Sequence, residues 1–390
     1  MSSTSLLPDQ SSAHVSLGHI PTWWEGESLY GWCSRVHTLE GCATKALGAI
    51  LFGRTHACRN VDVPVGMDRF VAATAGRLGG VEDILRNRTV LAAYWPFADA
   101  LTRENVVDAV TDVTGASAAQ MLGLTASRLG AHHPLRSCPD CRREQKKEKG
   151  FATWMVEQQL PGVWWCPSHH RPLEQVRENR AIWSKSGETD IELGRPATQA
   201  EALAMERMTA LAHRIPLIEH ANSDCLASSC IRRLRSLGLA TSSARLSTSK
   251  VQDWVDSRPI TGWIRRQGDA VMFPHGDWVV PMLRGRSREH PLKWMVLWTC
   301  LWSEEPLEQS LRAFDEAANG QVAIERGDQY LLWPDEGKLV RVALPEAVEE
   351  AFNSSQTVQG VMEMLGVSLR AVRLWMLEHP EFALAWGRRG

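Results

Sequence analysis

Apolar residues recur at helical spacing along most of the chain, and glycines follow several of these periodic segments. In residues 27–40, apolar side chains fall at positions 29, 32, 33, 36 and 39, and Gly41 comes next. This spacing places them on one face of a helix that ends at the glycine. The same reading predicts helices over 44–52, 66–79, 80–87 and 104–113. No long alternating strand pattern precedes residue 130, so the N-terminal part is predicted to be helical.

Helical patterning also dominates the second half of the chain. It predicts helices over 200–220, 223–238 and 292–302, and the last is apolar on most faces and therefore expected to be deeply buried. Near the C-terminus, a helix over 358–365, a glycine turn, Ser368 as N-cap and a second helix to about residue 378 have the length and punctuation of a helix-turn-helix.

Two short pairs of metal-binding residues stand in the middle of the chain. Cys138, Cys141, Cys166 and His169 form the pattern C-x2-C-x24-C-x2-H. Three thiolates and one imidazole satisfy tetrahedral zinc, and four protein ligands leave no position for water. The pattern predicts one structural Zn²⁺ ion. His170 is the alternative fourth ligand, although the spacing favours His169, and the segment between the pairs is expected to form a helix or hairpin that carries Trp154.

Other cysteines and histidines offer weaker sets. Cys33, His37, Cys42, His56 and Cys58 match no compact metal-binding spacing, and the same holds for a second set. That second set is His220, Cys225 and Cys230. Nine cysteines in 390 residues favour reduced thiols and a cytoplasmic setting over a disulfide framework. The polar residues 1–19 lack the apolar region of a signal peptide and are expected to form a flexible tail, and no apolar run is long enough to cross a membrane.

Net charge is −2, which argues against a wholly basic coat for nucleic acid, although local basic segments remain candidates. In the predicted helix-turn-helix, Arg370 and Arg373 lie where base edges are read, and Ser368 begins the same helix. The terminal Arg388 and Arg389 are candidates for phosphate contact. Three further basic segments, 136–149, 230–239 and 284–293, are weaker candidates, since a run of charge is usually a solvated face.

Catalytic motifs are missing from the sequence. There is no phosphate-binding G-x-x-x-x-G-K-[ST] loop, no G-x-G-x-x-G, no G-x-S-x-G elbow and no H-E-x-x-H. A binding or adaptor protein is therefore the favoured class, and a metal-dependent hydrolase or nuclease is the alternative.

Several segments of the chain form a recognisable set. They begin with "PTWWEGESLYGWCSRVHTLEG", continue through "LFG" at 51–53, and are most specific in "CPDC" and "EQQLPGVWWCPSHHRPL". Together they resemble the TniQ/TnsD family of transposon target-selection proteins. The segment "REHPLKWMVLWTCLW" and the closing helix-turn-helix resemble later parts of longer members. Some relatives carry a further C-x2-C soon after the histidine that matches His169. This chain does not, which puts a second zinc ion there in doubt.

The resemblance implies a mainly α fold with an N-terminal helix-turn-helix-like domain, a zinc-ribbon middle and a helical C-terminal region ending in a helix-turn-helix. The expected boundaries are a tail at 1–19, the TniQ domain at 20–130, the ribbon at 131–176, a linker at 177–199, the C-terminal region at 200–345 and the helix-turn-helix at 346–390.

The resemblance also implies a noncatalytic adaptor that links a DNA target to an AAA+ ATPase regulator and, through it, to the transposase. Such proteins reach the target by binding DNA directly or by docking on an RNA-guided CRISPR effector, and RNA-guided adaptors of this size are expected to be homodimers. The alternative function is a transcription regulator with a zinc ribbon and a helix-turn-helix, which needs no ATPase partner.

Overall fold

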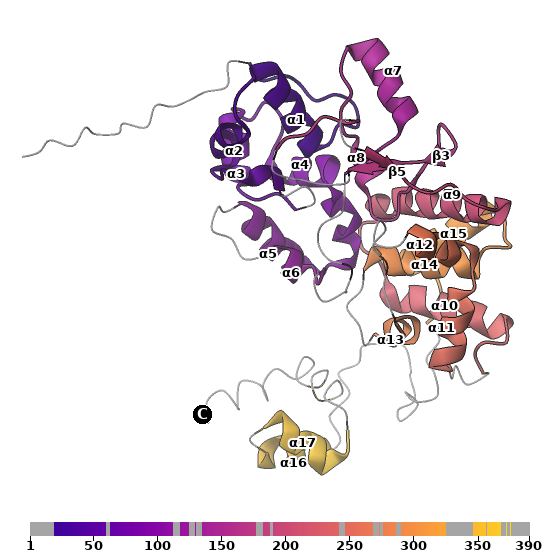
Figure 1. The fold of residues 1–390 in the computed structure, drawn as a ribbon. Helices are drawn as coiled ribbons and strands as arrows, with labels where there is room; N and C mark the ends of the chain where they lie inside the picture. Colours follow the sequence, from indigo (N-terminus) through magenta and orange to yellow (C-terminus); the bar gives the residue numbers. More distant parts are fainter. Residues whose placement is uncertain are drawn as a thin grey trace, which may run out of the picture. The chain divides into compact units, whose positions relative to one another are not determined.

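The computed structural model shows two compact units, a large unit of residues 1–329 and a small unit of residues 330–390. The structure describes residues 19–59, 63–111, 118–124, 129, 135–176, 182–187, 190–241, 246–267, 273, 276–285, 290–324, 346–355, 357–367, 372 and 375. Within these residues the chain is mainly helical, as Figure 1 shows, and the predicted fold class is confirmed at this level. None of the described helices is long and apolar enough to span a membrane.

The first part of the large unit is a cluster of short helices. They are α1 (Leu29–Glu40), α2 (Thr44–Phe52), η1 (Ala57–Arg59), α3 (Met67–Ala73), α4 (Val81–Arg88), η2 (Val90–Ala93), η3 (Trp95–Phe97), α5 (Ala100–Thr111) and α6 (Ala118–Met121). The Ser28 hydroxyl accepts the Gly31 N–H at the start of α1, and Gly41 ends α1 in the left-handed conformation. The helices predicted over 27–40 and 44–52 are confirmed as α1 and α2.

The middle of the large unit contains its described strands and two helices. The elements are β1 (Arg136–Ser137), α7 (Pro139–Lys149), α8 (Val156–Gln159), β2 (Trp165–Cys166), β3 (Arg171–Pro172), β4 (Glu174–Val176) and β5 (Asp190–Glu192). Strands β1, β4 and β5 form an antiparallel sheet in the order β1-β4-β5, and β2 pairs with β3 as a hairpin.

Trp154 lies neither in a helix nor in a hairpin, so that prediction is wrong. Gly150 ends α7 in the left-handed conformation, and the chain then runs extended beside the start of α1. The Ser28 N–H donates to the Trp154 carbonyl at 2.9 Å, and the Val156 N–H donates to the Gly26 carbonyl at 2.9 Å. Backbone pairing with a distant segment therefore decides the conformation of this stretch, and periodicity does not reveal such a partner.

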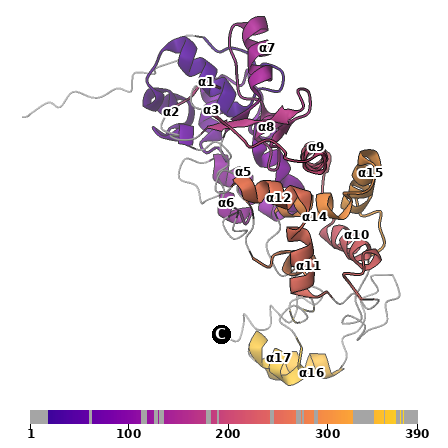
Figure 2. The same ribbon diagram turned by 45° about the vertical axis from the view of Figure 1, so that its right-hand side comes forward.

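The last part of the large unit is a layered group of helices. They are α9 (Gln199–Arg214), η4 (Ile215–Leu217), α10 (Ser223–Ser236), α11 (Thr248–Asp256), α12 (Pro259–Gln267), α13 (Val279–Leu283), α14 (Pro291–Leu301) and α15 (Leu307–Ala318). Helix α14 packs against α9, α10 and α12, and Figure 2 shows it among them. All eleven residues of α14 are buried, which confirms the burial predicted for 292–302.

The two largest hydrophobic cores among the described residues of the large unit both include side chains of the middle segment. The first core gathers side chains of α1 to α5 and takes Trp154 and Trp183 from farther along the chain. The second core surrounds α14 and includes Trp164 and Trp165. Trp164 lies against Trp263 of α12, with ring centroids 5.5 Å apart. Trp154 and Trp164 thus pack the middle segment against the helices that precede it and those that follow it.

Residues 177–199, the expected linker, contact the rest of the large unit where the structure describes them. Trp183 is buried in the first core, and β5 extends the sheet beside β4. The Ser34 hydroxyl donates to the Ser184 carbonyl at 2.7 Å, and the Trp154 indole N–H donates to the same oxygen at 2.9 Å. The polar composition indicated a connection, and the structure adds a buried tryptophan and hydrogen bonds that hold this passage against α1.

The small unit contains α16 (Glu346–Ser354) and α17 (Val358–Leu365), which pack together. Helix α17 ends at Gly366 in the left-handed conformation, so the first predicted helix and its glycine turn are confirmed. Val372 and Trp375 also belong to the apolar cluster of this unit, and the Trp375 ring lies 6.4 Å from that of Phe352. The rest of the predicted recognition helix lies outside the described residues.

Candidate metal centre

Local backbone structure presents each of the four predicted ligands. Cys138 is the N-cap residue of α7 and Cys141 lies in its first turn, because Pro139 begins the helix directly after the first thiol. Cys166 ends β2, and His169 lies in the turn that joins β2 to β3. A helix start and a hairpin turn therefore each supply two ligands, and the fold brings them together.

The ligand atoms lie at the separations that one tetrahedral ion requires. The Nδ1 atom of His169 is 3.6 Å from the Cys138 sulfur, 3.4 Å from the Cys141 sulfur and 3.5 Å from the Cys166 sulfur. The Cys141 and Cys166 sulfurs are 3.7 Å apart, and all four atoms lie within 4.8 Å of one another. Zn–S bonds of about 2.3 Å and Zn–N bonds of about 2.0 Å give tetrahedron edges of about 3.8 Å and 3.6 Å. The geometry is therefore compatible with a zinc site.

His169, and not His170, belongs to this cluster. His170 has the left-handed φ of 46°, its side chain is 72% exposed, and its Nδ1 lies 3.3 Å from a carboxylate oxygen of Glu206. The backbone turn directs the two neighbouring imidazoles to opposite sides. The C-x2-H spacing favoured His169 over His170 as the fourth ligand, and the structure places His169 in the cluster.

A carboxylate supports the imidazole from behind. The Nε2 atom of His169 lies 3.0 Å from Oε1 of Glu144, one turn along α7 from Cys141. With a metal ion bound at Nδ1, Nε2 would carry the hydrogen and donate to this carboxylate. Such a partner fixes the tautomer and ring orientation of a ligand histidine and raises its basicity. The sequence analysis assigned no role to Glu144, although its i, i+3 spacing from Cys141 places both on adjacent faces of one helix.

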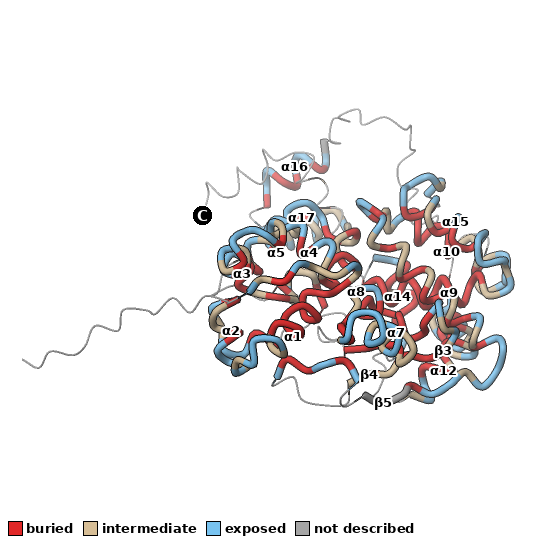
Figure 3. The backbone as a smooth tube through the Cα atoms, turned by 90° about the horizontal axis from the view of Figure 1, so that it is seen from above, coloured by how far each residue is buried: buried red, intermediate tan, exposed pale blue. Residues whose placement is uncertain are grey.

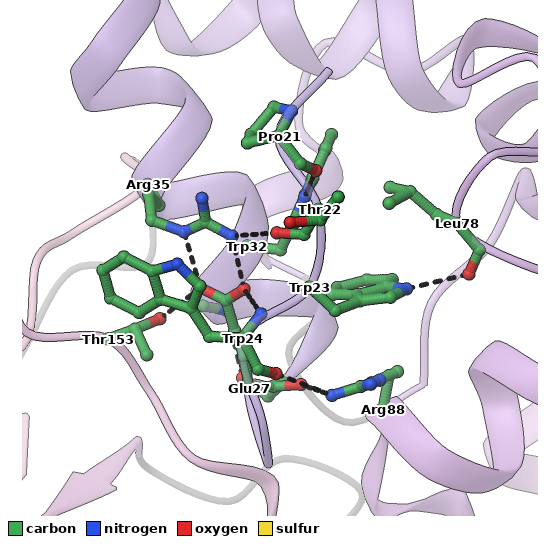
Figure 4. Close-up of polar contacts among 12 residues, drawn as sticks. Pro21, Thr22, Trp23, Trp24, Glu27, Trp32, Arg35, Leu78, Arg88 and Thr153 are labelled. Atoms are coloured by element: carbon green, nitrogen blue, oxygen red, sulfur yellow. Dashed lines mark hydrogen bonds and ion pairs between the residues drawn. The ribbon is translucent and has the colours of Figure 1, made fainter. Parts of the chain in front are cut away.

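A buried carboxylate that the sequence analysis did not select joins the centre to α1. Figure 4 shows Glu27, which is fully buried, between Arg35 and Thr153. Arg35 donates from Nε and Nη2 to the two carboxylate oxygens at 2.9 and 2.7 Å, and the Thr153 hydroxyl donates to Oε1 at 2.8 Å. A buried carboxylate needs such compensation, because unpaired charge is costly away from water. Glu27 therefore links the start of α1 to the segment that follows α7.

Close backbone contact strengthens this link. A side chain at Gly31 would meet the Trp154 carbonyl oxygen at 2.6 Å and the Thr153 hydroxyl at the same distance. Only glycine allows α1 to approach the extended segment so closely. The pair spacing of Glu27 and Arg35, eight residues apart on either side of two helical turns, is a signal in the sequence, but the partner Thr153 lies 126 residues away from Glu27.

The remaining cysteines do not form a second centre in the part of the chain that the structure describes. Neither of the two alternative sets, built on Cys33 and on Cys230, appears as a group of three or more ligand atoms there. Cys33, Cys58, Cys225, Cys230 and Cys300 are buried. Burial raises the pKa of the Cys33 thiol well above its ordinary range and the pKa of Cys300 to about 12, so these thiols stay protonated in apolar surroundings.

The candidate residues for DNA contact divide into three groups. Ser368, Arg370, Arg373, Arg388 and Arg389 lie outside the described residues. In 284–293, Lys293 is buried within α14, and in 230–239, Arg233 forms an ion pair with Glu305 at 2.6 Å. Helix α7, which covers most of 136–149, has no buried residue.

Comparisons with known proteins place the cluster in context. Residues 20–173 match the sequence model of the TniQ family, and all four cluster residues lie within this range. The chain is also 23% identical over 210 residues to the transposon Tn7 transposition protein TnsD of Escherichia coli. That alignment covers 52% of this chain and 40% of TnsD, so the chain spans about two fifths of the length of this curated relative.

Proposed function

From its membership of the TniQ/TnsD family, which both matches support, we propose that this protein is a noncatalytic target-selection adaptor of a transposon. It links a DNA target to an AAA+ ATPase regulator and, through that regulator, to the transposase. The observation that carries the proposal is the TniQ match over residues 20–173 with a compact Cys3His cluster inside it.

The chemistry of the cluster fits a structural role in such an adaptor. Cys138, Cys141, Cys166 and His169 would hold one zinc ion, which supplies a fixed tetrahedral junction between a helix and a hairpin. Four protein ligands leave no coordination position for a substrate. The centre would therefore set the position of α7 and of the extended segment beside α1, and it would perform no reaction itself.

Two modes of target selection remain within this proposal. A direct reader of DNA uses the predicted recognition helix with Arg370 and Arg373, whereas an adaptor docked on an RNA-guided CRISPR effector reaches its target through a protein interface and is expected to be a homodimer. Reversing the charge of both arginines abolishes duplex binding in the first mode and leaves transposition intact in the second.

The deciding experiment is expression of the chain together with the proteins encoded beside it, followed by purification and identification of all bound protein and nucleic acid. We expect an AAA+ ATPase to copurify. A guide-RNA complex in the same sample assigns the RNA-guided mode, and a sequence-specific shift of duplex DNA by the protein alone assigns the direct mode. Sequence-specific DNA binding with no ATPase association would instead identify a transcription regulator, and cleavage of DNA that stops on chelation would identify a nuclease.

A further inference from the structure

Helix α7 has no apolar face, and its position cannot come from core packing. None of its eleven residues is buried, and Figure 3 shows it in the colours of exposed and intermediate residues, with no buried stretch. A helix that is polar on all sides is not stable by itself in water at this length. Contacts at a few specific positions hold it instead, and those positions divide the helix into faces.

The inner face and both flanks of α7 are engaged with the rest of the large unit. On the inner face, Cys141 belongs to the Cys3His cluster, and Oε1 of the Gln145 side chain accepts the Thr153 N–H at 2.9 Å. On one flank, Arg142 donates to the Ser137 hydroxyl at 2.8 Å and pairs with Glu174, and the Lys149 ammonium lies 5.0 Å from the centre of the Trp24 ring.

The opposite flank is acidic, and its first two residues contact the rest of the ribbon. Asp140 pairs with Arg171 at 3.3 Å, and Oε1 of Glu144 lies 3.0 Å from Nε2 of His169. Glu148 follows four residues later on the same flank. The acidic side chains of α7 are therefore sorted to one side, where the first two of them make contacts within the ribbon.

The outer face consists of cations. Arg143, Lys146 and Lys147 have i, i+3 and i+4 spacing, which places them together on the side opposite Cys141 and Gln145. All three are exposed, and Arg143 pairs only with Asp140 of its own helix among the described residues. Neither lysine has an ion pair with another residue that the structure describes. The attraction of the helix C-terminus for cations accounts for lysines in the last turn, but not for Arg143, which lies a turn earlier.

We propose that this outer face, formed by Arg143, Lys146 and Lys147, is a docking site for the phosphate backbone of duplex DNA. Phosphates are the complementary partner, because exposed cations on one rigid face gain by releasing the counterions of DNA, and such contacts position a protein without reading sequence. The Arg143 side chain is 77% exposed, and an ion pair with so exposed a partner contributes little, so it does not prevent contact with a phosphate. The Cys3His cluster and the Lys149–Trp24 contact hold the helix at both ends, so the face is presented in a fixed direction.

This inference rests on the proposed function, in which a DNA target must be held, and it adds a sequence-independent contact away from the predicted recognition helix. The test measures binding of the purified full chain to a fluorescein-labelled duplex by anisotropy at several salt concentrations. The triple variant Arg143→Gln/Lys146→Gln/Lys147→Gln is compared with wild type. Glutamine keeps the helix propensity close to that of lysine and arginine.

We expect the triple variant to bind at least tenfold more weakly at ~0.1 M salt and to lower the slope of log K against log salt by about 2 to 3. The scattered variant Lys45→Gln/Lys250→Gln/Arg312→Gln removes the same charge from exposed positions on α2, α11 and α15 and should change the slope by less than about 1. The variant Lys146→Arg/Lys147→Arg keeps the charges and should bind as wild type does. Unchanged zinc content and circular dichroism establish that the variants are folded.

Three results would overturn the inference: an unchanged slope in the triple variant, an equal loss in the scattered variant, or no measurable binding of wild type to duplex at low salt. A loss of affinity confined to single-stranded RNA, or to a partner protein, would assign the face to that ligand instead and also overturns it. These outcomes are separate from failure of the proposed function, which is judged by copurification with an ATPase and does not depend on the slope.

Discussion

Helices α7 and α14 have the same length and both begin with a proline, yet different kinds of contact stabilise them. Each has eleven residues, and in each a proline occupies the first position after the N-cap residue. Every residue of α14 is buried, and no residue of α7 is. Local propensity and capping thus determine that both segments are helical, whereas their surroundings determine what keeps each in place.

The supports differ in number and in kind. Around α14, many apolar contacts act together; Trp298 alone stacks on Trp302 with ring centroids 3.7 Å apart and meets Phe314 edge-on at 5.1 Å. By contrast, a few discrete contacts hold α7 in place, chiefly those of Cys138, Cys141 and Lys149. A helix of the first kind loses stability by degrees, and one of the second kind is released when a single contact is removed.

The largest expected effect is the loss of the metal centre, which should release α7 and leave α14 in place. Cys141→Ser, or removal of metal with a chelator, eliminates a centre whose zinc binding is worth on the order of 10 kcal/mol in isolated zinc-binding peptides. We expect loss of bound zinc by elemental analysis and loss of hydrogen-exchange protection in α7, with protection in α14 retained. The matched control is Cys42→Ser, a half-buried thiol outside the cluster. Full protection of α7 amides in a zinc-free protein would contradict the comparison.

A substitution in α14 should lower the free energy of unfolding and leave the metal centre unchanged. Trp298→Ala removes a fully buried indole, its two ring contacts and its hydrogen bond to the Ser310 carbonyl at 3.1 Å. The free energy of unfolding should fall by about 3–5 kcal/mol, measured as a shift of the urea midpoint. Zinc content should not change. Trp254→Ala, at a half-buried indole, serves as the control and should cost less, and zinc loss in the Trp298 variant would show that the two supports are not independent.

The buried pair of Glu27 and Arg35 tests the link between α1 and the segment after α7. Glu27→Gln leaves the Arg35 guanidinium, which is 4% exposed, without its counter-charge. We expect a loss of about 3 kcal/mol in the free energy of unfolding, at the lower end of the range for broken buried pairs because glutamine keeps one acceptor oxygen.

The accompanying readout is hydrogen exchange at the Val156 amide, which donates to Gly26 and should lose protection. The double variant Glu27→Met/Arg35→Met removes both charges and should recover part of the lost stability. A double variant less stable than Glu27→Gln would show that the pair contributes more than mutual neutralisation.

The smallest expected effect concerns the carboxylate behind His169. Glu144→Ala removes the acceptor of the Nε2 hydrogen and should weaken zinc binding by about tenfold, measured by competition with a chromophoric chelator. Glu148→Ala, one turn farther along the same flank of α7, should leave zinc affinity unchanged. Equal effects of the two substitutions would mean that general charge, and not the hydrogen bond, is responsible.

Several of the helices, α1 and α14 among them, could be predicted from the sequence, because apolar spacing and capping residues act locally. Ser28 and Gly41 mark the two ends of α1, and the continuous apolar run of α14 indicated its burial. The spacing of the four Cys and His residues indicated a single candidate site, since paired ligands three residues apart suit one tetrahedral ion. Trp154 was misplaced for the opposite reason, because its partners lie far away along the chain.

By itself, the sequence determined the helical class, the location of α14 in a core and the four residues of the candidate metal centre, all of which depend on short-range spacing. Only the tertiary structure decided that Glu27 reaches Thr153, that Glu144 supports His169, and that Arg143, Lys146 and Lys147 face away from the protein. These arrangements depend on which distant segments meet. The physical reason is that a buried charge or an outward-facing one is defined by its surroundings, and no local pattern encodes them.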